Sequence, residues 1–311
     1  MSAATPRSTF YTASGMVPPT AWILVVTVLI PISAVAGMLY SAGIVHVPMV
    51  KLRWIGSVGL GWVIGMLAAK VCRIGKVRSP LFTFVTVIVG FLVAYYSAWG
   101  IHRALLVLGK VNAPNPVLFA LQGFLPNEIA SWMSVLFKNG NAEGITGLAL
   151  IIVWLIECGA IAYFTKSTFA TVWDDRPFCE TCDQWNEPAE SLLQLPVSPD
   201  DPSWQSVREG WLHSIRKLKI KENANETVAL TLSSCPNCDR SHFLTASGIG
   251  WQTNAAGEAT FVESKIFQYM SVTPAQITEL KELGELLDEA YQELIEEPED
   301  LDDSGVMQAN D

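Results

Sequence analysis

The stretch from Ala21 to Tyr40, AWILVVTVLIPISAVAGMLY, contains no charged residue. A helix needs roughly 20 apolar residues to cross about 30 Å of hydrocarbon, so this stretch predicts a membrane-spanning helix. Pro31 lies inside it and predicts a kink. A cleaved signal peptide is the alternative, because Ala34-Val35-Ala36 resembles a cleavage site. The distance between Arg7 and the apolar run favours the uncleaved helix.

Three further stretches are long and apolar enough to span a bilayer, at about 54–71, 81–100 and 145–164. Together they predict a four-helix transmembrane domain over 21–166, preceded by an N-terminal tail, 1–20. The connection at 115–138 is too apolar for an ordinary loop, and Pro126 divides it into two pieces of helical period. We expect it to lie flat at the membrane interface, with a re-entrant hairpin as the alternative.

Charge divides the chain into two halves. Residues 1–166 contain eleven Lys/Arg and three Asp/Glu, whereas residues 167–311 contain nine Lys/Arg and 27 Asp/Glu. The first half is therefore basic and apolar, and the second is acidic and water-soluble. An acidic surface repels phosphates, so nucleic acid is excluded as a partner of the second half.

The positions of the basic residues predict the orientation of the helices. The side that holds both termini has seven Lys/Arg: Arg7, Lys70, Arg73, Lys76, Arg78, Lys166 and Arg176. The opposite side has five: Lys51, Arg53, Arg103, Lys110 and Lys138. The compact cluster from Arg73 to Arg78 lies in a very short loop. These counts predict a multi-pass membrane protein with both termini in the cytoplasm.

Two cysteine pairs lie in the acidic half. They are Cys179-Glu180-Thr181-Cys182 and Cys235-Pro236-Asn237-Cys238. Two such pairs can complete the tetrahedral shell of a structural Zn²⁺ ion, and a reducing cytoplasm would keep the thiols free. Disulfide pairing is the alternative, and His242 is the nearby competitor for a ligand position. Four thiolates leave no open coordination position, which favours a structural role; a thiol or zinc redox sensor remains the alternative.

The spacing around the cysteines predicts a zinc-ribbon-like α+β domain over 167–272 with a helical insertion. We expect a loop at 191–201, a helix at 202–219, and strands at 227–232 and 241–246. A turn at 248–250 would lead to further strands at 251–254 and 259–268. Thr273 begins a capping box for an amphipathic acidic helix, 273–296, and a disordered acidic tail would follow at 297–311.

The predicted helices contain two features that could serve function. Glu157 is a carboxylate inside the fourth span; it could be a proton or cation site, or pair with a group such as His102 or Tyr95. Gly61 and Gly65 form a GxxxG motif that lets another helix approach closely, either within the bundle or in a homo-oligomer.

A family resemblance covers about the first third of the chain. The matching elements are residues 10–15 (FYTASG), Pro48, the glycine-rich second helix, the Gly75–Pro80 turn, and Tyr96 with Trp99. In these the chain resembles a family of uncharacterised bacterial four-helix integral membrane proteins. The cysteine pairs separately resemble zinc-ribbon knuckles. The resemblance implies the topology and a bacterial origin, and it implies no activity.

These observations lead to competing functions. We expect a membrane-anchored cytoplasmic scaffold that binds another protein through its ribbon or through the stripe Ile277, Leu280, Leu283, Leu287, Tyr291 and Leu294. A transport or channel component that uses Glu157 is the alternative. No Ser-His-Asp set, phosphate-binding loop or catalytic carboxylate pair is found in the sequence, so we do not expect an enzyme.

Overall fold

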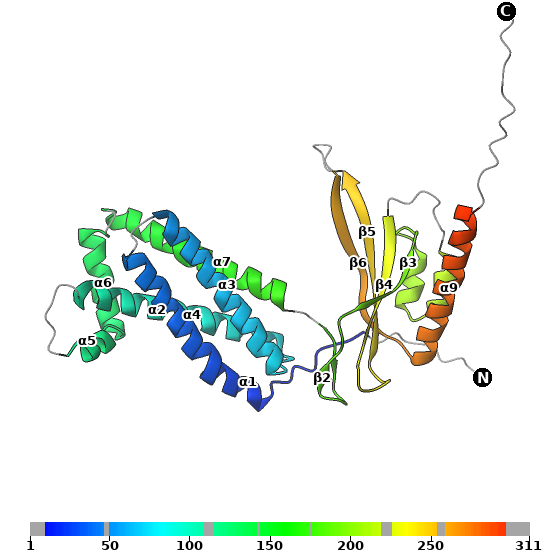
Figure 1. Ribbon diagram of the computed structural model, residues 1–311, viewed down its shortest axis with the longest axis horizontal. Helices are drawn as coiled ribbons and strands as arrows, with labels where there is room; N and C mark the ends of the chain where they lie inside the picture. The colour runs from blue at the N-terminus through cyan, green and yellow to red at the C-terminus, as the bar shows by residue number, and fades with distance from the viewer. Residues whose placement is uncertain are drawn as a thin grey trace, which may run out of the picture. The chain divides into compact units, whose positions relative to one another are not determined.

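The computed structural model describes residues 10–46, 50–108, 115–141, 144–173, 176–218, 226–253 and 259–296. The chain divides into two compact units. The helical unit is Ala13–Asp175, and the sheet unit combines Met1–Thr12 with Arg176–Asp311 (Figure 1). The predicted tail at 297–311 lies outside the described residues.

The helical unit contains four helices that are long and apolar enough to cross a membrane: Pro19–His46, Arg53–Ile74, Pro80–Val107 and Gly147–Val172. The first combines α1 (Pro19–Leu24), η1 (Val25–Leu29) and α2 (Ile30–His46). The others belong to α3 (Val50–Ile74), α4 (Pro80–Leu108) and α7 (Gly147–Val172), and the connection before α7 forms α5 (Pro116–Gln122) and α6 (Pro126–Asn139). All four extend beyond the predicted apolar stretches.

A π-helical segment, η1, lies just before Pro31. Proline cannot donate a backbone hydrogen bond, and its ring crowds the carbonyl four residues earlier, at Thr27. A wider turn at this point accommodates the ring. The proline therefore changes the local helix type without ending the helix, which continues to His46.

Small residues let the long helices pack closely. A Cβ atom at Gly37 of α2 would lie 2.0 Å from the Ala94 carbonyl oxygen of α4. At Gly65 of α3 it would lie 2.4 Å from the Thr165 carbonyl oxygen of α7, and Gly61 meets α7 in the same way. The GxxxG motif is therefore engaged within this chain.

The connecting helices pack on the long ones. The amphipathic α6 buries Ile129 and Leu136, and its Trp132 indole donates to His102 Nδ1 at 3.2 Å. Asn115 caps α5 by accepting from the Leu118 amide at 3.0 Å. The two short helices agree with the two predicted pieces of helical period, while their position at a membrane interface remains a prediction.

The sheet unit is built on an antiparallel sheet of order β3-β4-β5-β6. Its strands are β3 (Glu190–Leu195), β4 (Glu226–Ser234), β5 (His242–Thr253) and β6 (Ala259–Ser271). A separate hairpin pairs β1 (Phe178–Cys179) with β2 (Gln184–Trp185). The helices α8 (Ser203–Arg208), η2 (Leu212–Lys217) and α9 (Pro274–Glu296) cover one face of the sheet and enclose one hydrophobic core (Figure 1).

Three predictions in this unit are wrong. The segment predicted as a loop contains β3, because Leu193 and Leu195 alternate into the core. The helix predicted at 202–219 is two short pieces, since Gly210 has a φ of 99° that ends the first. The turn predicted at 248–250 is the middle of β5; Gly248 allows close packing, because a Cβ there would lie 2.6 Å from Pro199.

The predicted capping box at α9 is confirmed. The Thr273 amide donates to Gln276 Oε1 at 2.8 Å, and the Gln276 amide donates to Thr273 Oγ1 at 3.3 Å. Ile277 and Leu280 of the predicted stripe are buried in the core of the unit, and Leu283 packs against that core. The side chains of Leu287, Tyr291 and Leu294 lie outside the described residues.

The N-terminal segment belongs to this sheet. Phe10 forms an antiparallel bridge with Met270 of β6, and the Tyr11 amide donates to the Tyr269 carbonyl at 2.9 Å. The Tyr11 ring packs edge-on against Phe243 of β5, with 5.4 Å between the ring centroids. Residues expected in a simple tail therefore extend the free edge of β6.

Candidate metal centre and buried ion pair

The structure brings the four predicted ligands together. The Sγ atoms of Cys179, Cys182, Cys235 and Cys238 all lie within 4.8 Å of one another, and those of Cys179 and Cys238 are 3.6 Å apart. All four cysteines are free of disulfides. Four sulfurs about 2.3 Å from a central ion would lie about 3.8 Å apart, so the cluster has the size of a tetrahedral thiolate site.

Local turns aim the sulfurs at one point. Cys179 ends β1, and Cys182 lies in the turn of the β1–β2 hairpin, in which Asp183 has a φ of 50°. Cys235 and Cys238 lie in the turn between β4 and β5, which is closed by the Cys235 amide donating to the Ser241 carbonyl at 3.0 Å. The two turns belong to segments far apart in the sequence.

Asn186 joins these two turns, although no local sequence pattern marks it. Its side chain is 1% exposed. Its amide group donates to the carbonyls of Ser233 and Ser241 at 3.3 and 3.2 Å, and its Oδ1 accepts from Ser241 Oγ at 3.1 Å. Its backbone amide also donates to the Pro177 carbonyl at 2.9 Å. Asn186 therefore joins the two segments: its backbone bonds to the start of the β1–β2 hairpin, and its side chain bonds to both sides of the β4–β5 turn.

Hydrogen bonds and burial give the thiols unequal acidity. Hydrogen bonds with Cys238 raise the pKa of Cys182 to about 12, and burial raises the pKa of Cys179. Burial also opposes ionisation of Cys235, but hydrogen bonds from the Asn237 amide and the Gln184 side chain lower its pKa to about 6. Gln184 Nε2 lies 3.3 Å from the Cys235 sulfur. A bound cation would therefore favour ionisation of Cys179 and Cys182.

The side chains around the four cysteines have other roles. His242 Nδ1 lies 2.8 Å from Ser234 Oγ, and His242 does not belong to the cluster that the four cysteines form. Trp185 packs edge-on against Phe178 across the β1–β2 hairpin, with 5.0 Å between centroids. Arg176 is buried and donates to the Asn186 carbonyl at 3.2 Å. It therefore supports the residue that joins the two turns.

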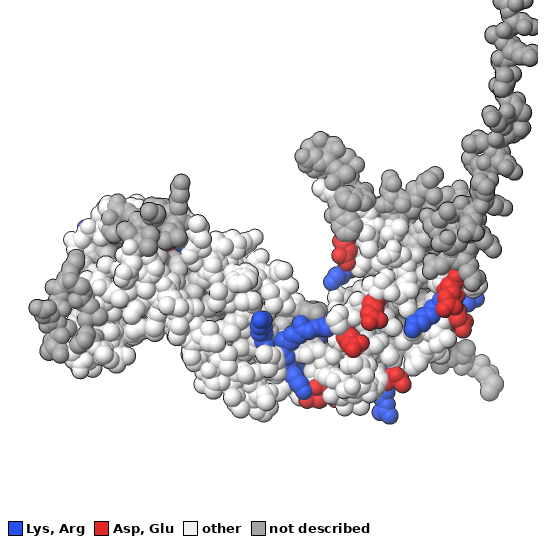
Figure 2. Space-filling view, in the orientation of Figure 1, with Lys and Arg blue, Asp and Glu red and all other residues white. Residues whose placement is uncertain are grey.

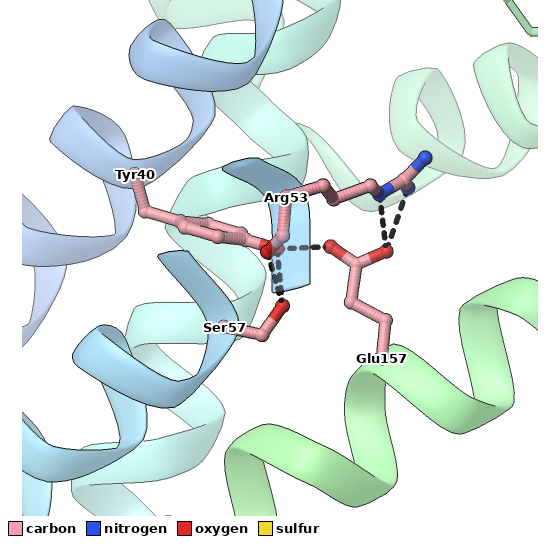
Figure 3. Close-up of polar contacts among 4 residues, drawn as sticks. All are labelled: Tyr40, Arg53, Ser57 and Glu157. Carbon is pink, nitrogen blue, oxygen red and sulfur yellow. Dashed lines mark hydrogen bonds and ion pairs between the residues drawn. The ribbon is translucent and has the colours of Figure 1, made fainter. Parts of the chain in front are cut away.

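The helical unit has its own polar centre at Glu157, which is buried in α7. One carboxylate oxygen accepts from Arg53 of α3, with Nη2 at 2.6 Å and Nε at 3.0 Å, and the other accepts from the Tyr40 hydroxyl of α2. Ser57 Oγ lies 2.9 Å from the Tyr40 hydroxyl oxygen. Figure 3 shows Tyr40 and Arg53 meeting different oxygens of the carboxylate.

The sequence named the wrong partners for Glu157. His102 bonds with Trp132 instead, and Tyr95 stacks on Phe91 with 5.9 Å between centroids. Arg53 precedes the apolar part of its helix, so the sequence pattern indicates only a charge in the preceding loop. An arginine side chain reaches several ångströms along a helix surface, and this reach is what a hydropathy pattern does not register.

A cavity of about 50 Å³ with a mixed polar and apolar lining adjoins this ion pair. Its walls include the side chains of Arg53 and Glu157, the aromatic residues Tyr95, Trp99 and Trp154, and His102. This volume exceeds the roughly 10–15 Å³ that one water molecule needs. All the lining residues come from the end of the bundle where α3 and α7 begin, so the cavity is a pocket at that end.

Comparison of the chain with protein-family models, curated proteins and solved structures found no match. The case for function therefore depends on the geometry of these two centres.

Proposed function

We propose that this chain is a multi-pass protein of the bacterial inner membrane whose sheet unit holds a structural Zn²⁺ ion in the cytoplasm and binds another protein there. The observation that carries the proposal is the convergence of four cysteine sulfurs within 4.8 Å of one another. The donor set is closed and symmetric, which favours a structural role for the metal over catalysis. We therefore propose a scaffold and no enzymatic activity.

The surface of the helical unit supports the membrane placement. Among the described residues, the face of this unit that Figure 2 shows carries few charged side chains. Large apolar side chains are exposed on all the long helices, among them Trp22, Val26, Leu39, Ile55, Trp62, Phe84, Leu92, Leu155 and Tyr163. An exposed apolar surface of this extent would drive aggregation in water and is stabilised by lipid.

The basic residues support the proposed orientation. Lys70, Arg73, Lys76, Arg78 and Lys166 lie near the ends of α3 and α7 and the start of α4. The two described carboxylates of the helical unit, Glu128 and Glu157, both pair with arginines toward the opposite end. The first end is therefore the more positive one, and the positive end of a bundle faces the cytoplasm.

The N-terminal strand supports the same topology independently. Phe10 and Tyr11 precede the first long helix, yet they pair with β6 of the sheet unit. Both segments must then lie on one side of the membrane, which requires an even number of crossings. The packing of Gly37 and Tyr40 within the bundle also supports an uncleaved first helix.

The partner surface that fits best is the groove between β3 and α9. The predicted apolar stripe begins with residues that are buried in the unit itself, so they are not free to bind a partner. The groove has a volume of about 610 Å³, and β3 is an edge strand of the sheet. Leu192 and Leu232 line it, with Lys281 and Glu285 on α9. We propose that an extended segment of the partner adds a strand to β3.

Metal analysis of the full chain, purified in detergent under reducing conditions, tests the zinc proposal. We expect one Zn²⁺ per chain and its loss in Cys179→Ser; metal-free wild type would overturn the proposal.

Crosslinking in cells tests whether a partner binds in the groove, by comparing two matched variants on α9. Glu285 lines the groove, whereas Glu282 is exposed and does not. We expect Glu285→Arg to abolish one crosslinked species that Glu282→Arg retains, and equal patterns would contradict the groove.

Transport through Glu157 is the weaker alternative. Arg53 already compensates the carboxylate, and the adjoining cavity is lined from one end of the bundle. A flux assay in liposomes that compares wild type with Glu157→Gln tests this alternative. Solute flux that depends on Glu157 would favour transport over the scaffold.

A further inference from the structure

Each cysteine pair of the cluster contains one buried and one partly exposed side chain. Cys179 and Cys235, the first members of the two pairs, are buried, whereas Cys182 and Cys238 are partly exposed. The two residues before Cys238 and the two after it are all exposed. A small water-soluble molecule can therefore reach the Cys238 sulfur from solvent.

The partly exposed Cys238 lies against the buried Cys179 of the other pair. Their Sγ atoms are 3.6 Å apart, although the two positions differ by 59 in the sequence. A disulfide bond is about 2.05 Å long, so the two sulfurs would have to approach by about 1.5 Å. Cys238 lies in the β4–β5 turn, outside both strands, so a shift of this size breaks no hydrogen bond of the sheet ladder.

Hydrogen bonds that involve no cysteine favour the same placement of the two turns. The side chain of Asn186, which follows the β1–β2 hairpin, donates to the carbonyls of Ser233 and Ser241 on either side of the β4–β5 turn. These bonds need no metal. The sulfurs of Cys179 and Cys238 therefore have a reason to stay close when the metal is lost.

We propose that Cys179 and Cys238 form a reversible disulfide when a hydroperoxide oxidises the cluster, and that this bond then joins the two turns in place of the metal. The Cys238 thiolate attacks the O–O bond of hydrogen peroxide, which gives a sulfenic acid on Cys238 and one hydroxide ion. The Cys179 thiolate then attacks that sulfur, forms the S–S bond and expels a second hydroxide ion. The two sulfurs lose two electrons, which the peroxide gains. The metal loses two of its four ligands and is released.

The disulfide would act on the proposed partner site. The β1–β2 hairpin leads into β3, which is the edge strand of the groove proposed to bind a partner. A covalent link at the hairpin would hold the start of β3 in place while the metal is absent. The bond is temporary in the proposed cytoplasmic location, because thiols reduce disulfides there. This role rests on the proposed metal centre, whereas formation of the bond requires only the two cysteines.

Disulfide mapping of the full chain, purified in detergent and treated with hydrogen peroxide, tests the bond. Arg208 and Lys217 lie between the two cysteine pairs, so trypsin separates the pairs unless a disulfide joins them. We expect a linked pair of peptides after alkylation and digestion without reduction, and fragmentation should identify Cys179 and Cys238. Disulfides confined within each pair, or a link through other cysteines, would overturn the proposal.

Two matched variants test the choice of cysteine. Cys182→Ser and Cys238→Ser each remove one partly exposed cysteine of the cluster. We expect the linked peptides to persist in Cys182→Ser and to fall at least fivefold in Cys238→Ser. Equal yields in the two variants would contradict the assignment, and the wild-type fragmentation stands even where a variant folds poorly.

Hydrogen exchange of the full chain tests whether the disulfide replaces the metal. We expect protection at 177–187 and 233–241 to fall when a chelator is added to the reduced chain, to return after peroxide treatment, and to fall again with dithiothreitol. Cys238→Ser should show no return. An oxidised chain that stays as unprotected as the reduced, metal-free chain would overturn the replacement.

Zinc content, measured before oxidation, distinguishes failure of this proposal from failure of the metal centre. Zinc-loaded wild type that forms no linked peptides would refute the disulfide alone. Metal-free wild type that forms them would refute the metal centre and, with it, the replacement of the metal by the bond.

Discussion

The two units bury their polar centres in different ways. The helical unit neutralises Glu157 with groups of its own chain, Arg53 and Tyr40, so its centre is complete as folded. The sheet unit gathers four cysteine sulfurs that could hold a metal ion, and in the proposed function its centre is complete only when that ion is bound. The first arrangement stabilises a fixed packing of helices, and the second would make part of a domain depend on metal.

Removing the metal should produce the largest difference between the units. Zinc bound by small peptides contributes about 10–16 kcal/mol, and this unit has a separate core, so we expect a local loss of about 5 kcal/mol or more. Hydrogen exchange of the full chain should show loss of protection at 177–187 and 233–241 after chelation. The long helices should be unchanged. Equal protection of these segments with and without chelator would show that the sheet unit depends on metal no more than the helical unit does.

Breaking the ion pair should destabilise the helical unit by about 3–5 kcal/mol, because either single change leaves a buried charge alone. We expect this for Arg53→Met and for Glu157→Leu, measured as thermal stability in detergent. The double variant should be far less destabilised than the two singles combined. Additive losses would show that the pair is not coupled.

Lowering the pH should act on the sheet unit through its metal. Cys179 and Cys182 have raised pKa values and are protonated near pH 7, whereas Cys235 is already ionised. Metal binding must displace at least those two protons, so affinity falls as pH falls. Two protons correspond to about 100-fold, or about 2.7 kcal/mol, for each pH unit below 7. Competition with a zinc chelator at pH 6 and 7 measures this, and pH-independent affinity would contradict it.

Asn186→Ala should cost about 2 kcal/mol, because it removes the buried side-chain amide that donates to the carbonyls of Ser233 and Ser241. Asn237→Ala is the matched control, since Asn237 is exposed and loses only its bond to Gln184. Metal affinity should fall in the first variant and stay nearly constant in the second. Chelator competition measures the metal affinity of both variants, and equal affinities would contradict a positioning role for Asn186.

Alanine at Gly65 should cost about 1–3 kcal/mol, because its Cβ would lie 2.4 Å from the Thr165 carbonyl oxygen. Gly159→Ala meets no atom within 4 Å and should stabilise the helix by up to about 1 kcal/mol. Thermal unfolding in detergent compares the two. A neutral Gly65→Ala would show that α3 and α7 separate easily.

The sequence predicted local features well where one residue type has one physical meaning. Long apolar stretches indicated the four long helices, and paired cysteines indicated the cluster. Glycine was harder to interpret, because it serves turns and close packing alike: Gly210 breaks a predicted helix, whereas Gly248 lies inside a strand. Asn186 and the partners of Glu157 depend on contacts between distant segments, and no local pattern records them.

The pairing of Phe10 with Met270 has a consequence for biosynthesis. Phe10 leaves the ribosome before the four long helices, and its partner strand emerges only after them. The segment around Phe10 must therefore wait, unpaired, until β6 has been made. Pairing of Phe10 with Met270 therefore requires that the intervening helices have been made and that both segments lie in one compartment.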